Sequence, residues 1–192
     1  MSPYVTNAGS YLVSVIFGIF ILAVMLRFLF QLVRADFYNP VSQAIVKLTT
    51  PALKPLRRVI PGLRGMDVPA LVLALVLQAL ELWLILAMSG NATPSPAGIL
   101  VLGIAELGKL TCWIFIIAVI AQVIISWVAP GAYNPMTQLL YSLTRPVLQP
   151  AQRLLPPVGG IDFSPLLTLV ALNLALMLVV APLRDLGAGL LA

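Results

Sequence analysis

The sequence contains no histidine and only one cysteine, Cys112. Without histidine, the protein lacks the commonest general base near neutral pH and the commonest metal ligand. One cysteine allows neither an intrachain disulfide nor a cysteine-cluster metal site. The sequence also lacks a glycine-rich phosphate loop and a serine-centred nucleophile motif. We therefore expect a protein that is not an enzyme and that has no catalytic residues, no cofactor and no metal site.

Charge is scarce as well, and apolar residues are abundant. Of the 192 residues, 9% are charged and 61% are hydrophobic, whereas an average soluble domain is roughly 25% charged. Four apolar runs, at residues 10–33, 68–88, 97–128 and 163–183, are long enough to cross a bilayer, which takes about 20 helical residues. The predicted fold class is therefore an all-α membrane protein with four transmembrane helices.

Basic residues gather in two of the connections between these runs. The first connection contains Arg34, Lys47, Lys54, Arg57, Arg58 and Arg64, and the third contains Arg145 and Arg153. The second connection and the stretch before the first run contain no lysine or arginine. Because basic loops stay on the cytoplasmic side, we predict a multi-pass protein with cytoplasmic first and third connections and both termini on the other side.

The two basic connections are copies of one another. A shift of 95 positions places NPVSQAIVKLTTPALKPLRRVIPGLRGMD on NPMTQLLYSLTRPVLQPAQRLLPPVGGID. The coinciding pairs include Asn39 and Asn134, Pro40 and Pro135, Gln43 and Gln138, Thr49 and Thr144, Pro51 and Pro146, Pro55 and Pro150, Arg58 and Arg153, Pro61 and Pro156, Gly65 and Gly160, and Asp67 and Asp162. We infer a tandem duplication with repeats at residues 1–96 and 97–192. Since each repeat has two spans, both enter the membrane in the same orientation, which predicts a parallel pseudo-two-fold arrangement.

Each copied segment, at residues 39–62 and 134–157, has the pattern of an amphipathic element. The Asn-Pro pair marks a helix start, because asparagine caps a helix and proline suits its first turn. Apolar residues then recur at helical spacing beside polar and basic ones. A second start at Thr50-Pro51 predicts a helix–break–helix, and Asp67 and Asp162 are placed to cap the spans that follow.

We expect these segments to lie along the membrane surface, with their basic residues near anionic lipid head groups, so the bilayer is the predicted partner. A solvated loop that carries only topology charges is the alternative. The prolines and the apolar period, which both copies retain, favour helices. Nucleic acid is not an expected partner, because the first basic segment lacks interleaved aromatic residues.

Four charged residues lie within the predicted spans, where each costs about 2.5–3.5 kcal/mol to insert. Arg27 lies near the cytoplasmic end of its span, so its long side chain can reach the interface. Glu106 and Lys109 are three residues apart on one helical face and can pair, and Glu81 lies at a similar depth. We predict a Glu81–Lys109–Glu106 cluster between the second and third spans, and we favour a structural ion pair over a transport role.

The 95-residue shift also aligns polar residues within the spans. It pairs Arg27 with Gln122 and Gln78 with Asn173. Gln78 and Asn173 lie near the middle of their spans, where interhelical hydrogen bonds are the favoured use. A polar pore on the pseudo-axis is the alternative. Because four spans rarely enclose a pore unaided, that alternative would require a homo-oligomer.

The repeated segments resemble the YggT family of bacterial inner-membrane proteins, which is related to the YlmG proteins of Gram-positive bacteria and chloroplasts. The stretches RADFYNPVSQAIVK, LKPLRRVIPG and GGIDFSPLL resemble the family signature, and two copies are typical of its Gram-negative form. With the charge pattern, the resemblance implies an inner-membrane protein with periplasmic termini. The second copy departs from the first where Lys47 becomes Ser142 and Arg57 becomes Gln152. This difference weakens any binding role that needs equal basic charge in both halves.

The resemblance implies a role in osmotic tolerance and ion homeostasis, by transport or by regulation of a transporter. Gram-positive relatives are linked to cell division, and chloroplast relatives to nucleoid distribution and cytochrome-complex maturation. The alternative is therefore a membrane scaffold or assembly factor that works through its cytoplasmic segments. A haem-handling role is disfavoured, because histidine ligands are absent. The resemblance supplies no catalytic residues.

Overall fold

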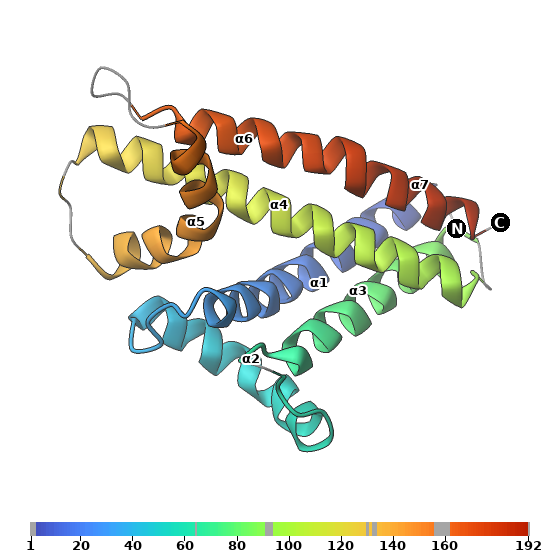
Figure 1. The fold of residues 1–192 in the computed structure, drawn as a ribbon. Helices are drawn as coiled ribbons and strands as arrows, with labels where there is room; N and C mark the ends of the chain where they lie inside the picture. Colours follow the sequence, from blue (N-terminus) through green and yellow to red (C-terminus); the bar gives the residue numbers. More distant parts are fainter. Residues whose placement is uncertain are drawn as a thin grey trace.

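The computed structural model describes residues 3–63, 65–90, 94–129, 131, 134–155 and 162–191, and most of this part of the chain is helical (Figure 1). Its helices are α1 (Pro3–Leu32), α2 (Pro40–Val59), α3 (Val68–Met88), α4 (Pro96–Val128), α5 (Pro135–Leu154), α6 (Ser164–Ala175), the π-helical turn η1 (Leu176–Val180) and α7 (Ala181–Gly189). Three residues named for the charge pattern or for the copied segments lie outside the described residues: Arg64, Pro156 and Gly160.

Four helical stretches are long and apolar enough to cross a membrane: α1, α3, α4 and the continuous run from α6 through η1 to α7. This confirms the predicted class of all-α membrane protein. Helix α3 has the predicted bounds, whereas α1 begins at Pro3 and the last run continues to Gly189. Those extensions are less apolar than the span centres, but a helix that has already formed propagates into them at low cost.

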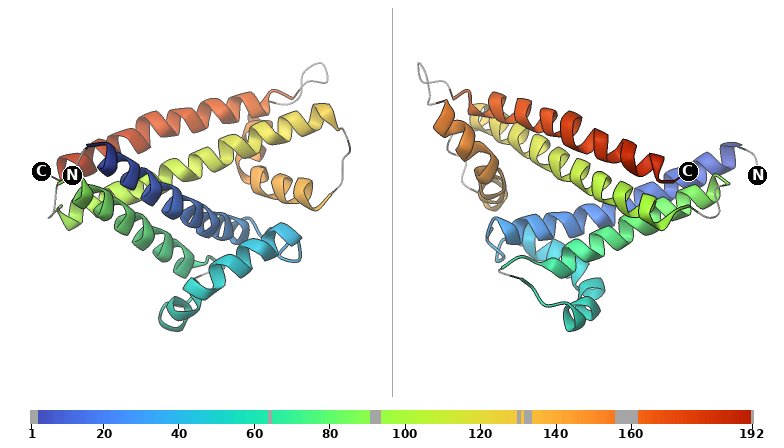
Figure 2. Two further views of the ribbon diagram at one scale, coloured as in Figure 1. Left: turned by 180° about the vertical axis from the view of Figure 1, so that it is seen from behind. Right: turned by 45° about the vertical axis from the view of Figure 1, so that its right-hand side comes forward.

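The two repeats have the same orientation, as the even number of spans predicts. Helices α1 and α4 both run away from the end where the two termini lie, and α3 and the α6–α7 run return to it (Figures 1 and 2). Within the repeats α1 packs along α3, and α4 packs along α6, η1 and α7. Contacts between α3 and α4 join the repeats. Figure 1 shows the repeats close together at the terminal end and farther apart at the other.

Helices α2 and α5 lie across the opposite end of the bundle, which we name the basic end. The predicted break at Thr50-Pro51 is wrong, because α2 continues as one helix to Val59 with Pro51 and Pro55 inside it. Helix α5 is likewise continuous, and both helices bend partway along (Figure 1). Two residues before Pro51, the Thr49 hydroxyl donates a hydrogen bond to the carbonyl of Ile45 over 2.7 Å. Prolines and such threonine bonds bend helices without ending them.

Small residues let α4 and α7 approach closely at the terminal end. A Cβ at Gly98 would lie 2.8 Å from Cδ2 of Leu191, and a Cβ at Gly187 would lie 2.8 Å from the backbone nitrogen of Leu102. Glycine therefore sets the spacing between these helices, as at other close contacts between membrane helices.

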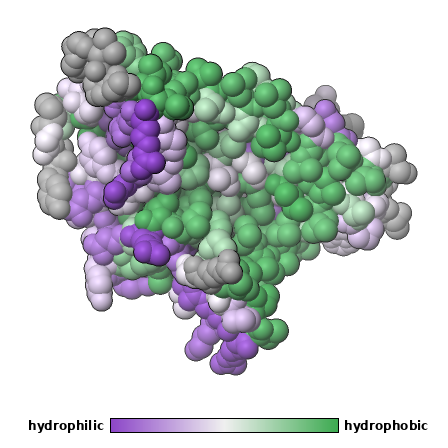
Figure 3. Space-filling view, viewed as in Figure 1, coloured by the Kyte–Doolittle hydropathy of each residue, from purple (hydrophilic) through white to green (hydrophobic). Residues whose placement is uncertain are grey.

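The outer surface of the spans is apolar, and the polar surface gathers at the basic end (Figure 3). Large side chains such as Ile19 and Ile117 are 63% and 62% exposed. Contiguous apolar surface of this kind marks a membrane or protein contact. The four spans therefore present a surface suited to lipid.

Candidate functional site

A polar cluster joins α1, α2 and the start of α3 at the basic end of the first repeat, with Arg27, Thr49 and Asp67 buried and Thr50 and Arg57 exposed. It consists of Arg27, Thr49, Thr50, Arg57 and Asp67, and we name it the arginine cluster. One guanidinium nitrogen of Arg27 donates to the hydroxyl oxygens of Thr49 and Thr50, over 2.8 Å and 3.0 Å. Nε of Arg27 lies 3.6 Å from Oδ2 of Asp67. Arg57 forms an ion pair with the same carboxylate oxygen.

Burial makes the arginine cluster energetically important. Arg27 is 5% exposed and Asp67 is 3% exposed. Desolvation of two charges is costly, and close pairing with further hydrogen bonds offsets that cost. Arg27 donates an additional hydrogen bond to the carbonyl of Val46 over 3.2 Å. We expected the long side chain of Arg27 to reach the membrane interface. It ends instead inside the protein, where it fixes α2 to α1 and α3.

The predicted capping role of Asp67 is wrong. Asp67 precedes α3, but its side chain makes no capping hydrogen bond. Its carboxylate instead faces Arg27 and Arg57. The Asp67 carboxylate pairs with the two guanidinium groups rather than with the first backbone amides of α3, because hydrogen bonds between charged groups are stronger than those to a neutral donor.

The second repeat carries amides at the equivalent positions, and we name Gln122, Thr144, Gln152 and Asp162 the amide cluster. The Thr144 hydroxyl donates to Oε1 of Gln122, at the place where Thr49 meets Arg27. Nε2 of Gln152 donates to Oδ2 of Asp162 over 3.3 Å, at the place where Arg57 meets Asp67. The second repeat therefore keeps two of these contacts between elements but lacks both positive charges, and its described residues show no contact equivalent to that of Arg27 with Asp67.

Asp162 has a different environment from Asp67. It is exposed, and its Oδ1 accepts a hydrogen bond of 2.8 Å from the backbone nitrogen of Ser164, the first residue of α6. Partial burial raises the pKa of Asp162, but hydrogen bonds from Ser164 and Gln152 outweigh this effect, so the pKa lies below its ordinary value. Asp162 therefore remains an anion at neutral pH, although none of the ion pairs found in the described residues includes it.

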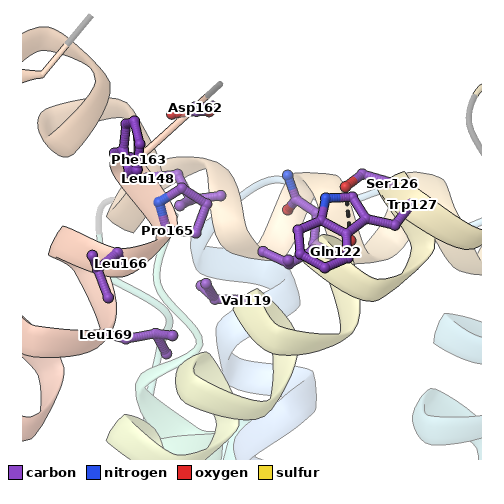
Figure 4. Close-up of a pocket in the computed structure, with 11 residues that line it drawn as sticks. Val119, Gln122, Ser126, Trp127, Leu148, Asp162, Phe163, Pro165, Leu166 and Leu169 are labelled. Carbon is purple, nitrogen blue, oxygen red and sulfur yellow. Dashed lines mark hydrogen bonds between the residues drawn. The ribbon is translucent and has the colours of Figure 1, made fainter. Parts of the chain in front are cut away.

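A cavity of about 670 Å³ opens beside the amide cluster, between α4, α5 and the start of α6. Figure 4 shows Asp162 and Phe163 on one side of it and Gln122, Ser126 and Trp127 on the other. The remaining lining residues are mainly apolar: Val119, Val123, Leu148, Pro165, Leu166 and Leu169. A smaller cavity of about 270 Å³ shares Gln122 and extends along α5 past Thr144 and Gln152.

The charged cluster predicted between the second and third spans forms only in part, because Glu81 lies within electrostatic range of Glu106 and Lys109 but is not ion-paired with Lys109 in the described residues. Lys109 pairs with Glu106 on α4, and Nε of Arg184 on α7 lies 3.4 Å from Oε1 of Glu106. Oε2 of Glu81 instead accepts a hydrogen bond of 2.9 Å from Nε2 of Gln78 on the same helix. None of the ion pairs found in the described residues joins Glu81 to Lys109. The sequence could not indicate Arg184, because its place beside α4 depends on how the last span packs.

The two mid-span amides do not make the predicted interhelical hydrogen bonds. Gln78 is buried and donates to Glu81 within α3. Asn173 is exposed, and its Nδ2 donates to the carbonyl of Leu169 within α6 over 2.8 Å. These two amides therefore line no shared polar path.

The residues that mark each repeat lie at the starts of α2 and α5. Oδ1 of Asn39 accepts from the amide of Val41, and its Nδ2 donates to the carbonyl of Pro135 in the other repeat. Asn134 and Thr137 form a reciprocal capping box. Other predicted positions lie on α2 and α5: Pro40, Gln43, Lys47, Lys54, Arg58, Arg145 and Arg153 are exposed, and Gln138 is half-buried. The described residues bring together no group of three His, Cys, Asp or Glu side chains that could hold a metal ion.

Comparison with known proteins agrees with the duplication. The family model described as CCB3/YggT matches residues 6–88 and again residues 101–183. An uncharacterized protein of Pseudomonas aeruginosa is 44% identical over 91% of this chain and 89% of its own. The uncharacterized protein YggT of Escherichia coli is 35% identical over 96% of both chains. No solved structure matches. The chain therefore belongs to the CCB3/YggT family of multi-pass membrane proteins, with one copy of the family's unit in each half.

Proposed function

We propose that this non-enzymatic protein acts in osmotic or ion homeostasis by regulating a transporter rather than by conducting ions itself. The observation that supports this role is the arginine cluster, which fixes α2 across α1 and α3. Helix α2 also carries Lys47, Lys54 and Arg58 on its exposed surface. Basic side chains near a membrane surface respond to its anionic lipids. A change in the charge of the membrane surface therefore acts on α2. The contacts of Arg27 with α2 and α3 transmit that effect to the spans.

The positions of the intramembrane charges support a regulator over a conductor. A path for ions needs charged or polar groups that face a common water-filled space. Glu106 is instead paired with Lys109 and Arg184, and Glu81 is hydrogen-bonded to Gln78. These local pairs are better suited to holding the helices together than to passing ions.

The regulator proposal places α2 and α5 at the cytoplasmic face of the bacterial inner membrane and both termini in the periplasm. The support is the distribution of lysine and arginine, which gather in the two segments that form the basic end. In this orientation the basic side chains meet the leaflet with the negative surface potential.

A membrane scaffold is the second candidate function. Exposed apolar side chains on the crossing helices favour it: Leu48 is 53%, Val59 is 81% and Leu154 is 76% exposed. These side chains can enter the interfacial region of the bilayer or contact another protein.

A growth assay under hyperosmotic shock, combined with flux measurements on purified protein in liposomes, tests the regulator. In a deletion strain, the wild-type protein is expected to restore growth and Arg27→Gln is not, because Arg27→Gln removes the ion pair with Asp67 and weakens the attachment of α2 to α1 and α3. Arg184→Gln removes one positive charge at the other end of the bundle and is the matched control, expected to restore growth at equal protein level. The liposomes should show no flux above empty ones.

Three outcomes would count against the regulator: flux by the purified protein, normal growth of the deletion strain, or full rescue by Arg27→Gln. A stable cross-linked complex with division or secretion proteins, without any osmotic phenotype, would favour the scaffold.

A further inference from the structure

The second repeat is open where the first is closed. Every residue that lines the cavity of about 670 Å³ has a counterpart 95 positions earlier in the chain. In the first repeat Ala70 and Ala74 are completely buried and Arg27 is 5% exposed, whereas their counterparts Pro165, Leu169 and Gln122 are only half-buried. Leu71 is 41% exposed in the first repeat. In the second repeat Leu166, the counterpart of Leu71, is 62% exposed, and Gln122 is shorter than Arg27. In the first repeat the guanidinium group of Arg27 occupies the equivalent position. A cationic group is therefore the kind of ligand that would fill the cavity of the second repeat.

The charge of the cavity favours a cation. Asp67 in the first repeat contacts two guanidinium groups. Asp162 receives only neutral donors, from Ser164 and Gln152, and takes part in none of the ion pairs of the described residues. Trp127 lies on the other side of the cavity (Figure 4), and the face of an indole ring attracts cations. An ammonium group at Asp162 would meet an anion, with an aromatic ring on the opposite wall of the same cavity.

The remaining walls suit a hydrocarbon chain. Val119, Leu166 and Leu169 continue the cavity along α4 and α6 away from the charged rim. Asp162 directly precedes the last span, which begins at Ser164, and Trp127 is next to the last residue of the third. These positions correspond to the level of lipid head groups, where tryptophan is common. The cavity is also within the usual range of ligand sites, about 300–1,000 Å³.

We propose that this cavity binds an aminophospholipid, with its primary ammonium at Asp162 and one acyl chain along Leu166 and Leu169. An ammonium group has three donors to satisfy, and the two carboxylate oxygens of Asp162 can accept hydrogen bonds from it besides those from Ser164 and Gln152. An anionic phospholipid fits less well, because its head group would face the Asp162 carboxylate. The proposal does not depend on the regulatory function.

Native mass spectrometry of the full chain in detergent tests the site with phosphatidylethanolamine and phosphatidylglycerol of identical acyl chains. Wild-type protein is expected to retain one phosphatidylethanolamine in preference to phosphatidylglycerol. Asp162→Asn should weaken this retention at least about tenfold, the loss expected for one charge-assisted hydrogen bond. Gln122→Arg should weaken it as well, because it places a guanidinium group where the first repeat has Arg27.

Asp36→Asn is the matched control for Asp162→Asn. Asp36 accepts a hydrogen bond of 2.8 Å from the amide two residues later, as Asp162 does, but it lies in the first repeat and outside the cavity. Retention by Asp36→Asn should equal that of the wild type. Circular dichroism of each variant establishes that a loss of lipid is not a loss of fold.

A second measurement locates the acyl chain. In a variant with Trp83 and Trp113 replaced by phenylalanine, phosphatidylethanolamine with brominated chains should quench the fluorescence of Trp127 more strongly than brominated phosphatidylglycerol. Equal retention of both lipids, unchanged retention in folded Asp162→Asn, or equal quenching would overturn the proposal. Asp162-dependent binding of a second copy or of a basic partner helix, in place of lipid, would overturn it too.

Discussion

The two repeats place an aspartate at the same point before a span, yet one aspartate is enclosed by arginines and the other faces amides. Asp67 is 3% exposed and contacts Arg27 and Arg57. Asp162 is exposed and receives hydrogen bonds from Gln152 and Ser164. Two contacts between helices have counterparts in both halves: that of Thr49 corresponds to that of Thr144, and that of Arg57 to that of Gln152. The ion pair of Arg27 with Asp67 has no counterpart among the ion pairs and hydrogen bonds of the described residues. Both repeats have the same arrangement of helices, but the first repeat is held closed by the ion pairs of Asp67, and the second is open beside Asp162.

The largest expected effect is the difference in unfolding free energy between a variant that lacks the Asp67 carboxylate and one that lacks the Asp162 carboxylate. Asp67→Asn leaves the guanidinium groups of Arg27 and Arg57 without a counter-charge, and Arg27 is buried. Breaking a buried pair in this way costs about 3–5 kcal/mol of unfolding free energy. Asp162→Asn removes an exposed carboxylate and should cost about 1 kcal/mol or less.

Unfolding by SDS in mixed micelles, followed by circular dichroism, gives both free energies. Equal losses for Asp67→Asn and Asp162→Asn would contradict the difference between a locked and an open repeat. The double variant should show the sum of the two losses, because the clusters share no side chain.

Replacing the equivalent threonines by valine should have a smaller effect. Thr49→Val removes one acceptor of Arg27, which keeps Thr50 and the Val46 carbonyl. Thr144→Val removes the hydrogen bond to Gln122. Valine has nearly the same shape, so the loss is that of hydrogen bonds, about 1.5–3 kcal/mol for Thr49 with its charged donor and about 1 kcal/mol for Thr144. The same SDS titration checks this order, and the reverse order would contradict it.

The smallest expected effect is a dependence of stability on pH that arises from Asp162 in the second repeat. The pKa of Asp162 is lowered by its hydrogen bonds below the ordinary value of 3.8. A lowered pKa in the folded state adds stability that is complete above 3.8 and disappears as the pH falls through the folded value. The difference in stability between wild type and Asp162→Asn should therefore shrink on acidification below 3.8. A difference that grows in acid would contradict this assignment.

The sequence predicted the elements of the fold better than their contacts. Apolar length defined all four spans, and the 95-residue shift gave their common orientation. The prolines at positions 51 and 146 suggested a break, but surrounding hydrogen bonds keep α2 and α5 helical. The partners of Arg27 were not predictable, because Thr49 and Asp67 are distant in sequence and meet only when α2 folds across α1 and α3. Arg184 reaches Glu106 for the same reason.

The spacing of the two repeats gives the molecule a shape with a mechanical consequence. Glycines bring α4 and α7 into close contact at the terminal end, whereas the spans spread apart toward α2 and α5 (Figures 1 and 2). A body that is narrow in one leaflet and broad in the other is a wedge. Such a body occupies more area in the leaflet that holds the amphipathic helices, and those helices are themselves sensitive to curvature. Membrane that bends to expand that leaflet would accommodate the protein with least strain.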